Sequence, residues 1–128
     1  MIDHTGLQVT DPKKSREFYE KALAPLGYQV LREIPTQFTG GKVVFGMGVA
    51  PKPDFWVAEG EPNSPRLHIA FRAETRAQVD AFYEAALAAG GTDNGKPGPR
   101  PHYHEHYYGA FVLDPDGHNI EAVIHTPE

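Results

Sequence analysis

The feature that most constrains this chain is an internal repeat that relates its two halves. The shift that places His4 on His68 also places Phe18-Tyr19-Glu20 on the identical Phe82-Tyr83-Glu84. Self-similarity at one fixed spacing is the signature of a duplicated supersecondary unit. The two halves of the chain are therefore predicted to fold as two copies of one module.

The first copy is predicted to contain one strand, one helix and three further strands. Asp11-Pro12 supplies a helix N-cap followed by a proline at the first helical position. Apolar residues then recur at helical spacing as far as Leu26, and Gly27 is typical of a helix C-terminus. Strands are expected at 28–34, 42–49 and 55–58, after an opening strand around 4–9.

The second copy repeats this order, with one longer excursion. Thr75 begins a capping box with Gln78, which matches the helix start of the first copy. The prolines of segment 94–106 exclude a helix and disfavour a central strand, so we expect an ordered loop over a site. Strands are then predicted at 107–113 and, after the Asp114–Gly117 turn, at 119–124.

These elements predict a single α+β domain covering residues 1–128. Module one spans residues 1–59 and module two spans residues 66–128. The connector, residues 60–65, is rich in turn-forming residues. No second large domain fits within this length.

Charge and composition limit the classes of binding partner and the types of metal ligand that this chain can have. The formal net charge of -5 and the lack of a Lys/Arg cluster argue against nucleic acid and against an anionic membrane surface. No apolar run approaches the roughly 18 residues of a membrane span, and the N-terminus lacks a secretory pattern, so we expect a cytoplasmic protein. The chain has no cysteine, and any metal site must therefore use histidine and carboxylate.

Three predicted strands have the same pattern, with apolar residues on one face and a potential metal ligand on the other. The ligands are His4, His68 and Glu121. Two imidazoles and one carboxylate match the facial set that leaves positions open on Fe or Mn, with Zn and Ni also possible. The alternatives are hydrogen-bonded core histidines and, for Glu121, a salt bridge with an arginine such as Arg72.

The opening His4-x-Gly6-Leu7, the Asp11-Pro12 helix, His68 and the closing Asp114-Pro115-Asp116-Gly117-x-x-Ile120-Glu121 resemble the vicinal oxygen chelate superfamily. This group includes glyoxalases, bleomycin resistance proteins and extradiol dioxygenases. The resemblance implies paired βαβββ modules whose cup-shaped mixed sheets enclose a divalent metal ion, usually in a homodimer. In the family pattern, His4, His68 and Glu121 fall on three ligand positions.

The resemblance implies a metal-dependent enzyme of the glyoxalase or extradiol dioxygenase type that acts on a small-molecule substrate with vicinal oxygens. The alternative is a drug-binding protein without catalysis, similar to bleomycin resistance proteins, which lack the ligand set. One departure concerns a fourth ligand, which glyoxalases carry on the last strand of module one. Moving back from Glu121 by the spacing of His4 and His68 gives Val57, and Glu59 shares the strand face of Val57. A missing fourth ligand favours family members that use three.

The second module also supplies candidates for catalysis and substrate binding. Loop histidines can act as general acid or base near neutral pH, and Tyr107 or Tyr108 can hydrogen-bond a polarised oxygen. An arginine on the strand face of His68 can bind a carboxylate. The single tryptophan either packs on the sheet or stacks on the ligand. We take as catalytic candidates His102, His104 and Tyr108, and as substrate-binding candidates Arg72 and Trp56.

Overall fold

The computed structural model describes residues 1–128 and contains the predicted duplication. Module one comprises β1 (Thr5–Val9), α1 (Pro12–Leu23), η1 (Ala24–Leu26), β2 (Gln29–Ile34), η2 (Thr36–Phe38), β3 (Val44–Gly48) and β4 (Phe55–Glu59). Module two comprises β5 (His68–Arg72), α2 (Arg76–Ala88), β6 (Thr92–Pro99), β7 (Tyr108–Leu113) and β8 (Asn119–Ile124). The strand orders are β1-β4-β3-β2 and β5-β8-β7-β6, so the two mixed sheets have the same topology. The predicted α+β fold of two βαβββ modules is confirmed.

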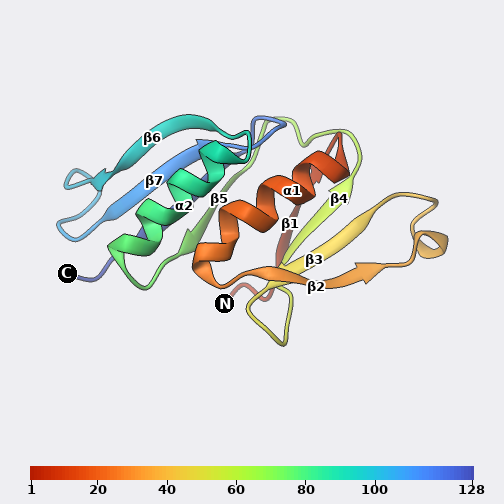
Figure 1. Ribbon diagram of the computed structural model, residues 1–128, viewed down its shortest axis with the longest axis horizontal. Coiled ribbons are helices and arrows are strands. Elements are labelled where there is room, and N and C mark those ends of the chain that lie inside the picture. The colour runs from red at the N-terminus through yellow and green to blue at the C-terminus, as the bar shows by residue number, and fades with distance from the viewer.

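Both helices lie side by side between the two sheets, with the strands of module two on one side and those of module one on the other (Figure 1). Each helix begins at the predicted cap. The Asp11 side chain accepts a hydrogen bond from the Lys14 N–H, and Thr75 accepts one from the Gln78 N–H. Each sheet therefore has one face covered by helix and one face that no helix covers.

The core follows the alternation of the strands. Leu7 and Val9 of β1 are buried against the helices, while Gly6 and Gln8 on the other face are exposed. The two modules meet where the Phe71 ring packs edge-on against the rings of Phe55 and Tyr28. The uncovered faces of both sheets are left available to a ligand or to another chain.

His118 links the two modules through hydrogen bonds of its buried side chain. Its imidazole is fully buried, its Nδ1 accepts a hydrogen bond from the Leu67 N–H at 3.1 Å, and its Nε2 lies 3.0 Å from the Gln8 carbonyl oxygen. Asp116 in the same turn accepts hydrogen bonds from the Thr10 backbone and hydroxyl. The turn that precedes β8 therefore fixes the end of β1 relative to module two.

The expected loop 94–106 is partly wrong, because residues up to Pro99 form the strand β6. β6 is an edge strand that pairs only with β7, and two register shifts interrupt the pairing. Proline is tolerated on an edge strand because its missing N–H can face outward. No helix in the structure is long and apolar enough to cross a membrane.

Candidate functional site

His68 and Glu121 meet on the uncovered face of module two. β5 and β8 pair in parallel with Ala70 opposite Glu121, which brings the imidazole at the start of β5 over the carboxylate. His68 Nε2 lies 2.9 Å from Glu121 Oε1. The Glu121 side chain is 1% exposed, whereas that of His68 is 51% exposed. The acid is buried in the sheet, and the imidazole lies between it and solvent.

Tyr107 is the second partner of the Glu121 carboxylate. Its hydroxyl donates a hydrogen bond to Oε2, the oxygen that His68 does not contact. Gly109 makes this possible, because a Cβ there would lie 3.1 Å from the Tyr107 ring and 3.2 Å from Glu121 Oε2. Burial raises the pKa of Tyr107, and the hydrogen bond to Glu121 raises it further. The phenol therefore stays protonated at neutral pH and acts as a donor.

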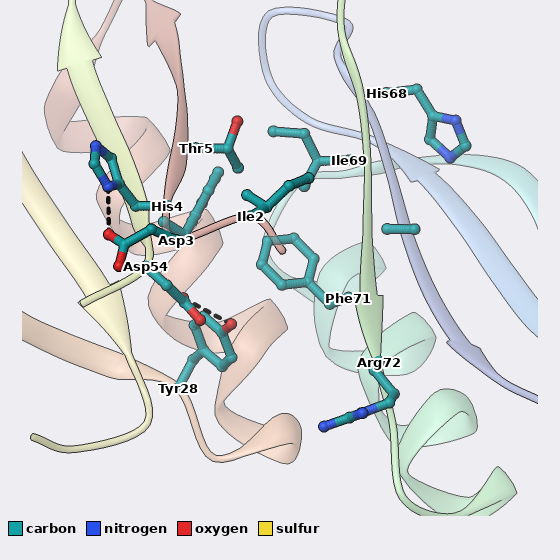
Figure 2. A pocket seen from close by; sticks show the side chains of 12 residues that line it. Ile2, Asp3, His4, Thr5, Tyr28, Asp54, His68, Ile69, Phe71 and Arg72 are labelled. Carbon is teal, nitrogen blue, oxygen red and sulfur yellow. Dashed lines mark hydrogen bonds and ion pairs between the residues drawn. The ribbon is translucent and has the colours of Figure 1, made fainter. Parts of the chain in front are cut away.

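His4 does not join this pair within one chain. It precedes β1, its side chain is 61% exposed, and its Nδ1 lies 2.7 Å from Asp3 Oδ1. The hydrogen bond from Lys52 lowers the pKa of Asp3, and that with His4 lowers it further. Figure 2 shows the imidazoles of His4 and His68 at opposite sides of a pocket, each pointing away from it. A single chain contains no cluster of three His, Asp or Glu side chains that could hold a metal ion.

The pocket between these histidines is separate from the candidate site, because Glu121 does not line it and the His68 imidazole points away from it (Figure 2). It has a volume of about 380 Å³ and lies where the two modules meet. The Tyr28 hydroxyl donates to Asp54 at its wall, and Arg72 extends beneath Phe71 into it (Figure 2). Arg72, our candidate for binding a substrate carboxylate, thus points into the module junction and not toward His68.

Trp56 occupies the position in module one that Glu121 occupies in module two. The register pairs Gly6 with Trp56, just as it pairs Ala70 with Glu121. The repeat spacing from Trp56 to Glu121 is therefore one residue longer than the spacing from His4 to His68. Val57, the position that the histidine spacing identifies, is instead fully buried in the core.

The one-residue slip moves the expected fourth ligand to the wrong sheet face. Glu59 shares the face of Val57, and its Oε1 accepts a hydrogen bond from the Val43 N–H at the end of β4. Neither residue is therefore directed to the uncovered face. The Trp56 ring lies there over Gly46, where an added Cβ would come within 2.9 Å of it.

The three catalytic candidates, His102, His104 and Tyr108, lie in three different environments. Tyr108 lies on the opposite side from Tyr107, where its hydroxyl donates to Asp80 of α2. It is therefore not near Glu121, and Tyr107 is the tyrosine that is. His102 is exposed and packs on Tyr103 at a ring distance of 4.3 Å.

His104 lies closer to the pair, through a residue that the sequence reasoning did not single out. Its Nε2 is 2.6 Å from Nδ1 of His125, and its ring is 5.6 Å from that of Tyr107. His125 follows β8 at an even spacing from Glu121, so strand alternation could have identified it as a neighbour on the same face. His104 and His125 form an imidazole pair at the rim of the site.

The chain is a paired-module α+β protein, in which each βαβββ module has one sheet face that no helix covers (Figure 1). One of these faces carries a buried carboxylate beside a histidine. The chain belongs to the Glyoxalase/Bleomycin resistance protein/Dioxygenase superfamily, whose family model matches residues 1–122. A probable lactoylglutathione lyase of Vibrio cholerae is 32% identical to this chain, over an alignment that covers 95% of this chain and 88% of the relative.

Solved structures share the fold. A glyoxalase/bleomycin resistance protein from Albidiferax ferrireducens superposes with a TM-score of 0.72 at 25% identity, covering 97% of this chain and 98% of that one. A fosfomycin resistance protein from Listeria monocytogenes, solved with Mn(II) and 1S,2S-dihydroxypropylphosphonic acid, gives a TM-score of 0.68 at 20% identity, covering 100% of this chain and 90% of that one. The second likeness shows the fold alone.

Proposed function

We propose that this chain is a divalent-metal-dependent enzyme that acts on a small molecule with two neighbouring oxygens. The observation that carries the proposal is the buried Glu121 carboxylate facing the half-exposed His68 imidazole at 2.9 Å on an uncovered sheet face. A buried carboxylate is costly without a compensating charge. A half-exposed imidazole compensates only part of that cost, whereas a divalent cation bound by both groups compensates it well.

We further propose that the third ligand, His4, comes from a second copy of the chain. β1 and β5 are edge strands with one free side each, and within one chain the two imidazoles point away from each other. A two-fold dimer that faces the module-one sheet of one chain with the module-two sheet of the other would bring His4 to His68 and Glu121 twice.

The donor set fits a divalent ion of the Fe, Mn, Zn or Ni type, because imidazole nitrogen and carboxylate oxygen are ligands that these ions share. When bound, such an ion supplies a Lewis acid for two adjacent substrate oxygens. Tyr107 orients the Glu121 carboxylate through its hydrogen bond. His104 is our candidate for holding a proton at the rim, since its ring packs beside that of Tyr107, whereas the ring of His102 packs on Tyr103.

Trp56 bears on which reaction the enzyme catalyses, because it decides whether a fourth metal ligand is present. The Vibrio cholerae relative is named a probable lactoylglutathione lyase. The resemblance to glyoxalases implies a fourth ligand on the last strand of module one, and Trp56, the residue of that strand equivalent to Glu121, cannot ligate a metal. We therefore favour a three-ligand reaction, such as dioxygenation or group transfer, over the lyase reaction. Oxygen consumption with Fe(II) and catechol, measured beside thioester formation from methylglyoxal and glutathione, separates these reactions.

Mixing two inactive variants tests the proposed site. His4→Ala and Glu121→Gln each remove a ligand, and in a mixed dimer one of the two shared sites keeps all three. A refolded equimolar mixture should therefore regain about a quarter of the parent's tight metal sites, while each variant alone has none. If the site lay within one chain, mixing would regain nothing. If either variant alone bound the ion like the parent, the ligand assignment would be wrong.

The second candidate function is ligand sequestration without catalysis, and the observation that favours it is the half-exposed Trp56 ring over Gly46. An indole on an uncovered sheet face is a stacking surface for a flat ligand. A tight ligand whose affinity is unchanged by chelator, together with no turnover of dicarbonyl, catechol or epoxide substrates, would establish this alternative in place of the enzyme.

A further inference from the structure

Arg100 is a cation that backbone hydrogen bonds hold in place beside the candidate site. It follows β6, and its guanidinium lies over the Phe111 ring, 5.5 Å from the ring centroid. Nη2 donates to the Lys96 carbonyl at 2.7 Å and Nη1 donates to the Gly98 carbonyl at 2.9 Å. The long side chain is therefore already ordered, and a ligand that uses it would not have to bear that entropic cost.

The charge of Arg100 has no acidic partner. Every ion pair in the structure involves other residues, and no carboxylate oxygen lies within 4.0 Å of this guanidinium. Backbone carbonyls orient the group without neutralising it. They also leave Nε–H and part of Nη2 free, because the guanidinium has five N–H donors. A half-buried cation with free donors, in a chain of net charge -5, offers the charge and the N–H donors that an oxyanion accepts.

This cation is contiguous with the proposed ligands. Phe111 is opposite Glu121 in the β7–β8 register, and its ring centroid is 6.1 Å from that of the His68 imidazole. The Phe111 ring thus neighbours both the guanidinium and the His68 imidazole. A cavity of about 260 Å³ lies here, lined by Asn94, Gly95, Arg100, Tyr103, Phe111 and Asn119.

We propose that Arg100 and this cavity bind an oxyanion of the substrate, so that the substrate is an acid that carries its two neighbouring oxygens a short distance from a carboxylate or phosphate. This inference rests on the proposed function for its account of those neighbouring oxygens. It assigns the acid-binding role to Arg100 in place of Arg72, whose side chain extends into the module junction.

Matched chelators test the inference. Butanohydroxamate and pentanohydroxamate carry two adjacent oxygens and an alkyl tail, while succinate monohydroxamate and glutarate monohydroxamate have the same lengths and end in a carboxylate. Calorimetric titration of the Mn(II)-loaded protein should show at least one acid probe binding about tenfold or more tighter than its alkyl partner. Arg100→Gln should abolish that preference and leave the alkyl affinity unchanged. Arg100→Lys should retain part of it, and the control Arg72→Gln all of it.

Two results would overturn the assignment. One is equal binding of acid and alkyl probes by the parent. The other is an equal loss of both in Arg100→Gln, which would mean that Arg100 only shapes its loop.

A titration without metal keeps this test independent of the proposed enzyme. If no hydroxamate responds to Mn(II), the metal proposal fails, and the role of Arg100 is then decided with inorganic phosphate and acetate followed by NMR. Weaker phosphate or acetate binding in Arg100→Gln, with Arg72→Gln unchanged, supports the anion site and shows which oxyanion it prefers. Equal binding of both anions by parent and Arg100→Gln refutes it.

Discussion

Replacing Glu121 by glutamine separates a metal ligand from a structural ion pair. The amide has nearly the same volume, and its oxygen can still accept the hydrogen bond from Tyr107, so the main loss is the charge. As an ion pair with a half-exposed His68, the carboxylate contributes at most about 1 kcal/mol to the free energy of unfolding. The cost of removing the carboxylate from water offsets this contribution. Without metal, the free energy of unfolding of Glu121→Gln should therefore lie within about 1 kcal/mol of the parent value.

With metal, the two proteins should differ strongly. An ion at one hundred times its Kd stabilises the parent by about 2.7 kcal/mol, which is roughly a 10 °C rise in Tm for a chain of this size. Glu121→Gln should show almost no rise. The measurement is thermal unfolding by circular dichroism at one protein concentration, with chelator or with Mn(II), and His106→Ala as the control. A metal-free loss above about 2 kcal/mol, combined with a parent-like metal shift, would refute the ligand role and establish the salt bridge.

Three further substitutions test the packing and the site. His118→Phe fills the buried volume but leaves the Leu67 N–H and a β1 carbonyl unpaired, and urea unfolding should show a loss of about 2–4 kcal/mol. Burial first, and then Asp114, raise the pKa of Tyr19 far above 10.0. The parent should therefore lose stability as pH rises past about 10, whereas Tyr19→Phe should lose about 1.4 kcal/mol less per pH unit there. Trp56→Glu supplies a carboxylate at the position equivalent to Glu121 and should tighten Mn(II) binding roughly tenfold by calorimetry, while Trp56→Leu should not.

The duplicated fold could be predicted because its signals are local and occur twice. Helix caps, the apolar face of each helix and the two-residue alternation of strands are all properties of short segments. The pairing of His68 with Glu121 also follows from alternation, once β5 and β8 are neighbours. The path of segment 94–99 could not be predicted, because its prolines are compatible with an edge strand or with a loop, and the pairing partner decides between them.

The site details that the sequence left open all depend on a single residue of register. Tyr107 and Tyr108 are adjacent, and the strand face decides which one reaches Glu121. Trp56 and Val57 are likewise adjacent, and the lengthening of the repeat spacing by one position decides which of them faces the cup. Side-chain direction reverses at every strand residue, so a repeat aligned only to within one residue cannot assign a face.

The separation of His4 from His68 follows from how the modules pack within one chain. The helices occupy the space between the two sheets, with the Phe71 ring packed against module one at the junction, so the two ligand-bearing faces cannot close on each other without unpacking that core. On our proposal, a second chain completes each site, and metal binding and association then stabilise one another by mass action. Dilution should weaken the metal site even when the fold of each chain is intact. A metal affinity that is independent of protein concentration across the dimer–monomer transition would contradict this coupling.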